Sequence, residues 1–192
     1  KVFVNQLTGT LFTIAKDVKI QVEFNPAKVK AYRLIGYENR KLENKDFNDD
    51  KKDAGELGAG HTVTALYEVV PFDSKEEFAK TDDLKYQKVA VAPSDDLLTV
   101  KLRYKESIGD TSKLLSKEVN SKAEVIKPSN NFEFASAVAE FGLLLRNSQY
   151  KAGASYRDVL ERAKAAKGSD SDEYRADFIK LVEIAQMVDT RK

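Results

Sequence analysis

The first half of the chain is organised by an alternation of apolar and polar positions. Between Val18 and Phe24 every second residue is apolar, and charged or polar residues lie between them. A period of two puts the apolar side chains on one face, which is typical of a strand with one buried face. A second run, Val29 to Tyr37, is rich in β-branched and aromatic residues, and Asn25-Pro26 separates the two runs. We expect them to pair as a long hairpin.

More strand-like runs follow a charged stretch at residues 38–56, which we interpret as a solvated loop with at most one short strand. The alternation is strongest at residues 98–105, and further strands are expected at residues 62–70, 85–92 and 114–120. No long helical connection lies between these runs, so their sheet should be mostly antiparallel. About six such strands are typical of a sandwich or an open barrel.

After Pro128 the apolar residues recur at helical spacing, and three helices are expected. Each has a capping residue at its start, and Gly168 follows the second helix. The expected starts are Asn130 with Glu133, Ser155 with Asp158, and Ser171. Strands followed by helices predict an α+β fold. We expect a mostly antiparallel β-sandwich-like domain at residues 17–127 and a three-helix segment at residues 128–192 packed on it.

The first residues also show helical spacing, through Val4, Leu7, Leu11 and Ile14. The chain has no initial methionine and opens inside this pattern, so we expect it to be a fragment whose natural N-terminal part has been removed. A mature N-terminus left by processing is the alternative. An exposed apolar stripe on a helix favours association with another surface, so we expect this helix to pack on the β-domain or on a second copy.

The composition narrows the range of partners. The 192 residues include 32 basic and 31 acidic ones, for a net charge of +1, which gives no sign of a nucleic-acid partner. There is no cysteine, so disulfides and thiolate zinc sites are excluded. No apolar run approaches the ~20 residues that a membrane span requires.

A glycine-rich stretch, GELGAGHT at Gly55–Thr62, differs from the phosphate-binding loop pattern by one letter, His61 in place of lysine. A phosphate loop follows a buried strand and opens a helix. Here a charged stretch precedes the glycines and a β-like run follows them. We therefore interpret the stretch as a lead into a strand, where glycine permits positive φ.

The acidic stretch suggests one alternative, a divalent-metal-binding regulatory module. Carboxylate-rich loops with a glycine turn bind Ca²⁺, but the EF-hand pattern fails here at Lys51 and Leu57. An irregular site, or simply a solvated loop, remains open. The candidate ligands are Asp46, Asp49, Asp50, Asp53 and Glu56.

Nucleophilic catalysis requires a nucleophile, a base and an orienting group. His61 is the single histidine in the sequence, and no catalytic residue or cofactor is predicted. A carboxylate-based hydrolase is a further alternative, and it would need two carboxylates within ~5–10 Å of each other.

Two blocks, NPAKVKAYRLIGYENR and DAGELGAGHTVTALYE, resemble the C-terminal domain of uncharacterised bacterial proteins that contain a von Willebrand factor type A domain. The resemblance extends to LTVKLRYK and FGLLLRNSQYKAGASY and so covers most of the chain. It implies that residues 1–16 are the last helix of the type A domain. The metal motif of that domain, Asp-x-Ser-x-Ser, does not occur here, because Asp110-Thr111-Ser112-Lys113-Leu114 lacks its last serine.

These observations predict a non-catalytic accessory module that mediates protein–protein interaction, in the bacterial cell envelope, either periplasmic or at the surface. Its expected partners are the preceding type A domain and a further protein that the sequence does not identify.

Overall fold

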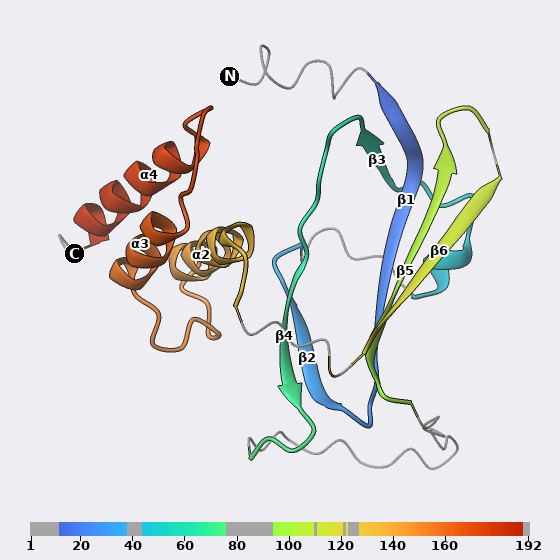
Figure 1. The fold of residues 1–192 in the computed structure, drawn as a ribbon, viewed down its shortest axis with the longest axis horizontal. Helices are drawn as coiled ribbons and strands as arrows, with labels where there is room; N and C mark the ends of the chain where they lie inside the picture. The colour runs from blue at the N-terminus through green and yellow to red at the C-terminus, as the bar shows by residue number, and fades with distance from the viewer. Residues whose placement is uncertain are drawn as a thin grey trace. The chain divides into compact units, whose positions relative to one another are not determined.

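The computed structural model describes residues 12–37, 44–75, 94–109, 111–120, 122 and 127–189. The chain divides into two compact units, residues 1–124 and residues 125–192. The first unit contains strands and the second contains helices (Figure 1). The expected boundary between residues 127 and 128 lies close to this division, and the packing of one unit on the other stays a prediction.

The β unit contains two antiparallel sheets. The larger sheet has the strand order β3-β1-β5-β6, and the smaller one pairs β2 with β4. Their bounds are β1 Thr13–Phe24, β2 Val29–Ile35, β3 Gly55–Gly58, β4 Leu66–Pro71, β5 Asp96–Glu106 and β6 Ser112–Asn120. All pairings among these described strands are antiparallel. The expected α+β class with antiparallel sheets is confirmed.

The two sheets face each other through an aromatic cluster. The ring of Phe24 lies 4.4 Å from that of Tyr32 and 5.4 Å from that of Tyr67. Phe24 ends β1, whereas the two tyrosines belong to β2 and β4, so the cluster joins the larger sheet to the smaller one. This arrangement is sandwich-like, as the sequence predicts.

The expected hairpin of β1 with β2 is wrong. β1 lies between β3 and β5, and β2 pairs with β4. The cause is the turn at Asn25, whose backbone N–H donates to Leu97 and whose side chain donates to the carbonyl of Asp96 at 2.7 Å. These bonds fix the end of β1 to the start of β5, and the chain leaves the larger sheet before β2 begins.

The helix expected over residues 1–16 is wrong at its end, because residues 13–16 belong to β1. Residues 1–11 lie outside the described residues. The register of β1 with β5 is interrupted between Lys16 and Lys19, which pair with Lys105 and Arg103. Asp17 lies in this bulge with φ 51°. A bulge inserts one extra residue and breaks the period of two, so this end of the strand does not show the alternation of its other half.

The remaining strands differ from expectation mainly at their ends. β5 and β6 confirm the strands expected at residues 98–105 and 114–120. The run at residues 62–70 forms a strand from Leu66 onward, and the strand expected at residues 85–92 lies outside the described residues. The glycine stretch, expected to lead into a strand, itself forms the short strand β3.

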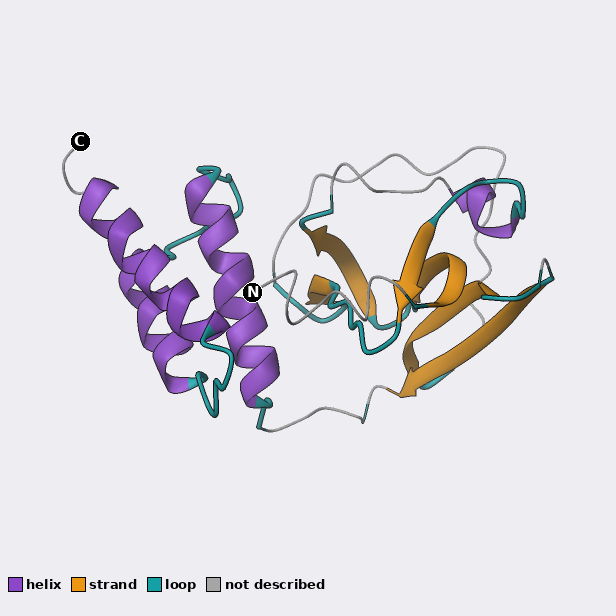
Figure 2. Ribbon diagram, turned by 90° about the horizontal axis from the view of Figure 1, so that it is seen from above, coloured by secondary structure: helices purple, strands orange, loops and turns teal. Residues whose placement is uncertain are grey.

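The helical unit consists of α2 Asn130–Leu145, α3 Tyr156–Ala165 and α4 Tyr174–Asp189 (Figure 2). Its core contains Ala137, Phe141, Val159, Leu160, Ala163, Ile179 and Val182. Phe141 packs edge-on against Tyr156 of α3 and Phe178 of α4. The three predicted helices are therefore confirmed, with one shared core.

The capping residue of α3 is the expected one, whereas the capping residues of α2 and α4 lie one position before the expected ones. Ser155 and Asp158 form a complete capping box. The cap of α2 is Ser129, whose hydroxyl accepts from the N–H of Phe132 at 3.1 Å, so the expected cap at Asn130 is one residue late. At α4 the carboxylate of Asp170, not Ser171, accepts from the first N–H groups. Gly168 adopts φ 59° after α3, as expected of a residue that ends a helix.

Candidate functional site

In the described part of the β unit, a cleft of about 730 Å³ lies between the two sheets. This volume lies within the range of known ligand-binding pockets. Its walls come from β1, from β2 and β4, and from the edge strand β3 with the loop that follows it. The residues that form most of the apolar wall are Val18, Ile20, Val22, Leu34, Leu57 and Val63.

The cleft exists because the smaller sheet covers only one end of the apolar face of β1. Phe24, at the covered end, is 8% exposed, whereas Ile20 is 52% exposed. Tyr32 and Val63 border the same cleft and are 55% and 62% exposed. The alternation that predicts a buried face for β1 is correct in orientation, but part of that face remains accessible in this unit.

Several polar side chains around the cleft form ion pairs or hydrogen bonds with neighbouring residues. Arg33 forms an ion pair with Glu68 at 2.5 Å, and Glu56 Oε2 accepts from the hydroxyl of Thr13 at 3.3 Å. Tyr37 donates its hydroxyl to the carbonyl of Thr64 at 3.2 Å. The charge of Arg33 is thus balanced by Glu68, Glu56 is hydrogen-bonded to a neutral hydroxyl, and the surface that the cleft offers is mainly apolar.

Burial at the cleft also affects one tyrosine of its wall. The pKa of the Tyr67 hydroxyl is raised, first by burial and then by its neighbour Tyr32. A phenol with a raised pKa stays neutral at physiological pH, so it adds a hydrogen-bonding group but no charge to this wall.

The glycine stretch lines the cleft and is not a phosphate loop. Gly55–Gly58 forms β3, antiparallel to β1 at the edge of the larger sheet. Residues 61–65 have no regular structure, and β4 rather than a helix follows. His61 is exposed, and Gly60 adopts φ 77°, which fits the expected need for positive φ. The block that resembles the bacterial family therefore forms part of the cleft.

The five acidic candidates of residues 46–56 do not converge on one point. Asp46 pairs with Lys52 at 3.7 Å, and Asp49 accepts from the backbone N–H of Lys51. In the part of the chain that the structure describes, no three or more His, Cys, Asp or Glu side chains are grouped to hold a metal ion. Metal binding by Asp46, Asp49, Asp50, Asp53 and Glu56 stays a prediction.

Instead, the acidic loop at residues 46–56 contacts the larger sheet through ion pairs and hydrogen bonds with basic residues of β1 and β5. Asp50 pairs with Arg103 at 3.1 Å and accepts from Ser112 at 2.5 Å. The Ser112 hydroxyl and the Arg103 guanidinium hold the pKa of Asp50 below its ordinary value. The side chain of Lys105 donates to the backbone carbonyl of Asp50 and to the carboxylate of Asp17 at 2.7 Å.

The hydrogen bond between Lys19 and the acidic loop is not predicted by the sequence pattern. The side chain of Lys19 is 2% exposed, and its ammonium group donates to the backbone carbonyl of Asp49. The alternation of β1 assigns Lys19 to the polar face, which is correct, but nothing in the local pattern indicates that a loop thirty residues later covers it.

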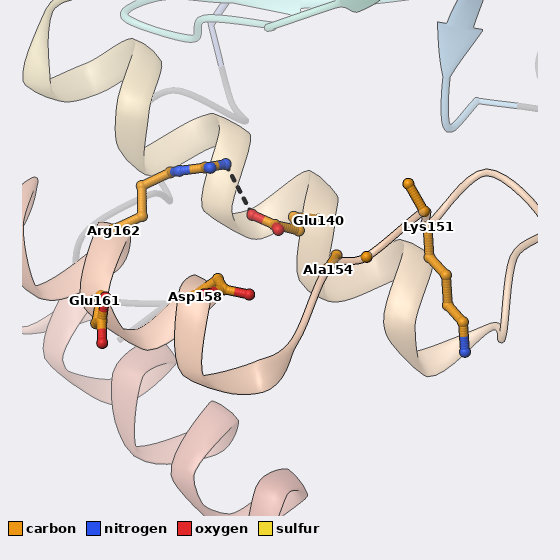
Figure 3. Close-up of a pocket in the computed structure, with 8 residues that line it drawn as sticks. Glu140, Lys151, Ala154, Asp158, Glu161 and Arg162 are labelled. Carbon is orange, nitrogen blue, oxygen red and sulfur yellow. Dashed lines mark hydrogen bonds and ion pairs between the residues drawn. The ribbon is translucent and has the colours of Figure 1, made fainter.

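A second hollow, of about 570 Å³, lies in the helical unit (Figure 3). Its charged groups already have structural partners: Arg162 binds Glu140 at 2.7 Å, and Asp158 caps α3 by accepting from Ser155. Lys151 donates to Asn147 at 2.6 Å. These contacts assign structural roles to the charged groups named here, and the carboxylate-based hydrolase stays a prediction.

Among the helices in the described ranges, none combines the length and the apolar character that a membrane span requires.

Comparison of the sequence with known proteins identifies the family of this chain. Residues 9–188 match the family described as "Uncharacterized protein YfbK, C-terminal". The chain is 41% identical over 192 residues to "Uncharacterized protein YfbK" of Escherichia coli (strain K12), a match that covers 98% of this chain and 32% of that protein. No solved structure matches. The chain thus belongs to the family of the C-terminal region of uncharacterised protein YfbK.

Proposed function

We propose that this chain is a non-catalytic interaction module of a larger bacterial protein in the cell envelope, and that its cleft binds a von Willebrand factor type A domain that precedes it. Two observations support a role within a larger protein. The chain spans only 32% of the relative's length, and its sequence blocks resemble the region that follows a type A domain.

The exposed apolar wall of the cleft carries the proposal. Ile20, Tyr32 and Val63 are each more than half exposed although they border one hollow. Covering about 100 Å² of apolar surface on each would contribute roughly 2.5 kcal/mol apiece at 25 cal/mol per Å². Association costs about 4–15 kcal/mol of lost translational and rotational freedom, so about 7.5 kcal/mol from the three is of the same order, and covalent linkage to the partner lowers the cost.

The paired charges support a non-catalytic role. Catalytic acids, bases and nucleophiles are themselves hydrogen-bonded, but to partners that orient and activate them for proton transfer or attack. Around both described hollows, the charged groups considered above are bound to neighbouring residues. We expect no turnover of ester, glycoside or phosphate-ester substrates, and saturable hydrolysis of any of them that is lost on substitution of Glu56 would contradict the non-catalytic role.

The binding test uses Val63, which lies in a stretch without regular structure. The region preceding this chain in the full-length protein is produced separately and titrated with the chain by isothermal calorimetry. Val63→Asp removes apolar contact and places a charge in the cleft, so we expect the affinity to fall at least about 60-fold, the equivalent of the 2.5 kcal/mol above.

Leu114→Asp is the matched control, because Leu114 is 53% exposed on β6 and does not line the cleft. We expect its affinity to stay within about twofold of the unchanged chain. Equal affinities for all three proteins would exclude the cleft as the binding surface. A complete lack of binding, with no Asp-x-Ser-x-Ser motif in the preceding region, would exclude the type A domain as partner.

A further inference from the structure

The helix α4 is apolar on two faces. Its core face includes the buried side chains of Ile179 and Val182. A second set, Leu181, Ile184 and Val188, recurs at positions i, i+3 and i+7, and these side chains are 53–55% exposed. Such spacing puts the three side chains on one stripe of the helix. Packing of α4 in the helical core requires only its buried face, so the core does not explain the second, exposed apolar stripe.

The helix α2 carries a similar pair of exposed apolar residues. Val138 and Leu145 lie seven positions apart and are 43% and 58% exposed. On the same helix, Phe134 and Phe141 point to α4, where their rings lie 5.3 and 5.5 Å from that of Phe178. At about 100° per residue, Val138 and Leu145 lie just beyond these rings.

The contacts with α3 show on which side both stripes lie. On α2, Glu140 points to α3 through its ion pair with Arg162. On α4, Glu183 points to α3 through Lys164 at 2.7 Å. Counting 100° per residue from these ion pairs, both exposed stripes lie past the α2–α4 ring contact, on the side away from α3. They therefore border one surface, which we call the α2–α4 groove.

We propose that the α2–α4 groove is a homodimer interface, in which α4 of a second copy packs antiparallel against α4 so that Leu181 of each copy faces Ile184 of the other. An apolar helical stripe of the same spacing fits this surface, and α4 itself presents one. A two-fold arrangement uses the same surface on both copies, so one self-complementary stripe is sufficient.

The exposed surface is large enough for a specific contact. Five side chains of this size, each about half exposed, present on the order of 500 Å² per copy, which gives about 1,000 Å² for the pair, the lower bound of specific interfaces. α4 has 16 residues and so spans about 24 Å. Glu183, the acidic residue between Leu181 and Ile184, is directed to Lys164 and away from the groove.

Sedimentation equilibrium of the whole chain tests this interface. We expect a mass of twice 21.5 kDa at concentrations of about 100 μM, and dissociation into monomers on Leu181→Glu or Ile184→Lys, with at least a tenfold weaker dimer. Both side chains are exposed, so the helical circular dichroism of the variants should match that of the unchanged chain. Phe132→Lys, on an exposed residue of α2 that faces away from the groove, should leave the dimer intact.

A mixture of the two charged variants gives a sharper test. In the antiparallel arrangement the glutamate introduced in one copy would face the lysine introduced in the other, so equimolar Leu181→Glu and Ile184→Lys chains should form a heterodimer. A monomeric unchanged chain at 100 μM would overturn the interface. So would charged variants that dimerise as the unchanged chain does, and failure of the mixture to associate would overturn the antiparallel register.

Discussion

The substitution Phe141→Ala should unfold the helical unit and leave the β unit folded. Phe141 is 5% exposed, and its ring packs edge-on against Tyr156 and Phe178. Truncation of a buried phenylalanine costs about 3–5 kcal/mol through lost burial and the cavity that remains. A unit of about 70 residues has a total stability of only about 3–10 kcal/mol at 0.05–0.15 kcal/mol per residue. The loss is thus comparable to the whole stability of residues 125–192.

Amide hydrogen exchange followed by mass spectrometry resolves the two units separately. Peptides from α2, α3 and α4 should exchange near the rate of an unfolded chain in Phe141→Ala, whereas peptides from β1 and β5 should exchange as in the unchanged chain. Phe132→Ala removes the same side chain from a position that is 51% exposed, so it should change the stability by less than about 1 kcal/mol. Equal loss of protection in both units would show that they fold as one, and a loss below about 1 kcal/mol would refute the assigned core.

Three other substitutions or additions give smaller effects. Ser155→Ala removes the capping box of α3 and should lower the free energy of unfolding of the helical unit by about 1 kcal/mol in urea titrations; an unchanged midpoint would contradict the cap. The hydrogen bond from Lys105 lowers the pKa of Asp17 below its ordinary 3.8, so its contribution is present above pH 3.8 and is lost as the pH falls through the lowered value. Asp17→Asn keeps a side chain that tolerates positive φ, so thermal unfolding of the variant should lose part of this acid sensitivity, and an identical pH profile would refute the assignment. Addition of 5 mM Ca²⁺ should leave the melting temperature unchanged, because the carboxylates of residues 46–56 are dispersed; a rise of several degrees would support the metal-binding alternative.

The parts of the fold that depend on local sequence could be predicted. β5 follows directly from its strict alternation, and the start of α3 follows from Ser155 and Asp158, because a capping box is made by residues three apart. The three-helix segment likewise follows from helical spacing after Pro128. In each case the residues that determine the structure lie within one turn or one strand of it.

The parts that depend on distant contacts could not be predicted. The pairing of β1 with β5 is fixed by hydrogen bonds from Asn25 to residues about seventy positions away. The burial of Lys19 depends on a loop thirty positions away. The bulge at Asp17 shifts residues 13–16 out of phase with the alternation of residues 18–24, so the local pattern does not identify them as part of the same strand.

The candidate site was only partly visible in the sequence. That the glycine stretch is not a phosphate loop follows from the strand-like run after it, but its role as a wall of the cleft depends on β3 lying at the edge of the larger sheet. The exposed end of the apolar face of β1 has no sequence signal, since the same alternation would be seen if the smaller sheet covered all of it.

Hydrogen exchange at residues 61–65 tests the proposed binding role most directly. These residues are exposed, have no regular structure and include Val63 and Ala65 of the cleft wall. We expect their amides to exchange at least tenfold more slowly in the full-length protein than in this chain alone, because the preceding domain would cover them. Peptides from α3, outside the cleft, should exchange alike in both. Equal exchange at residues 61–65 in the two proteins would contradict the proposal that the cleft binds the preceding domain.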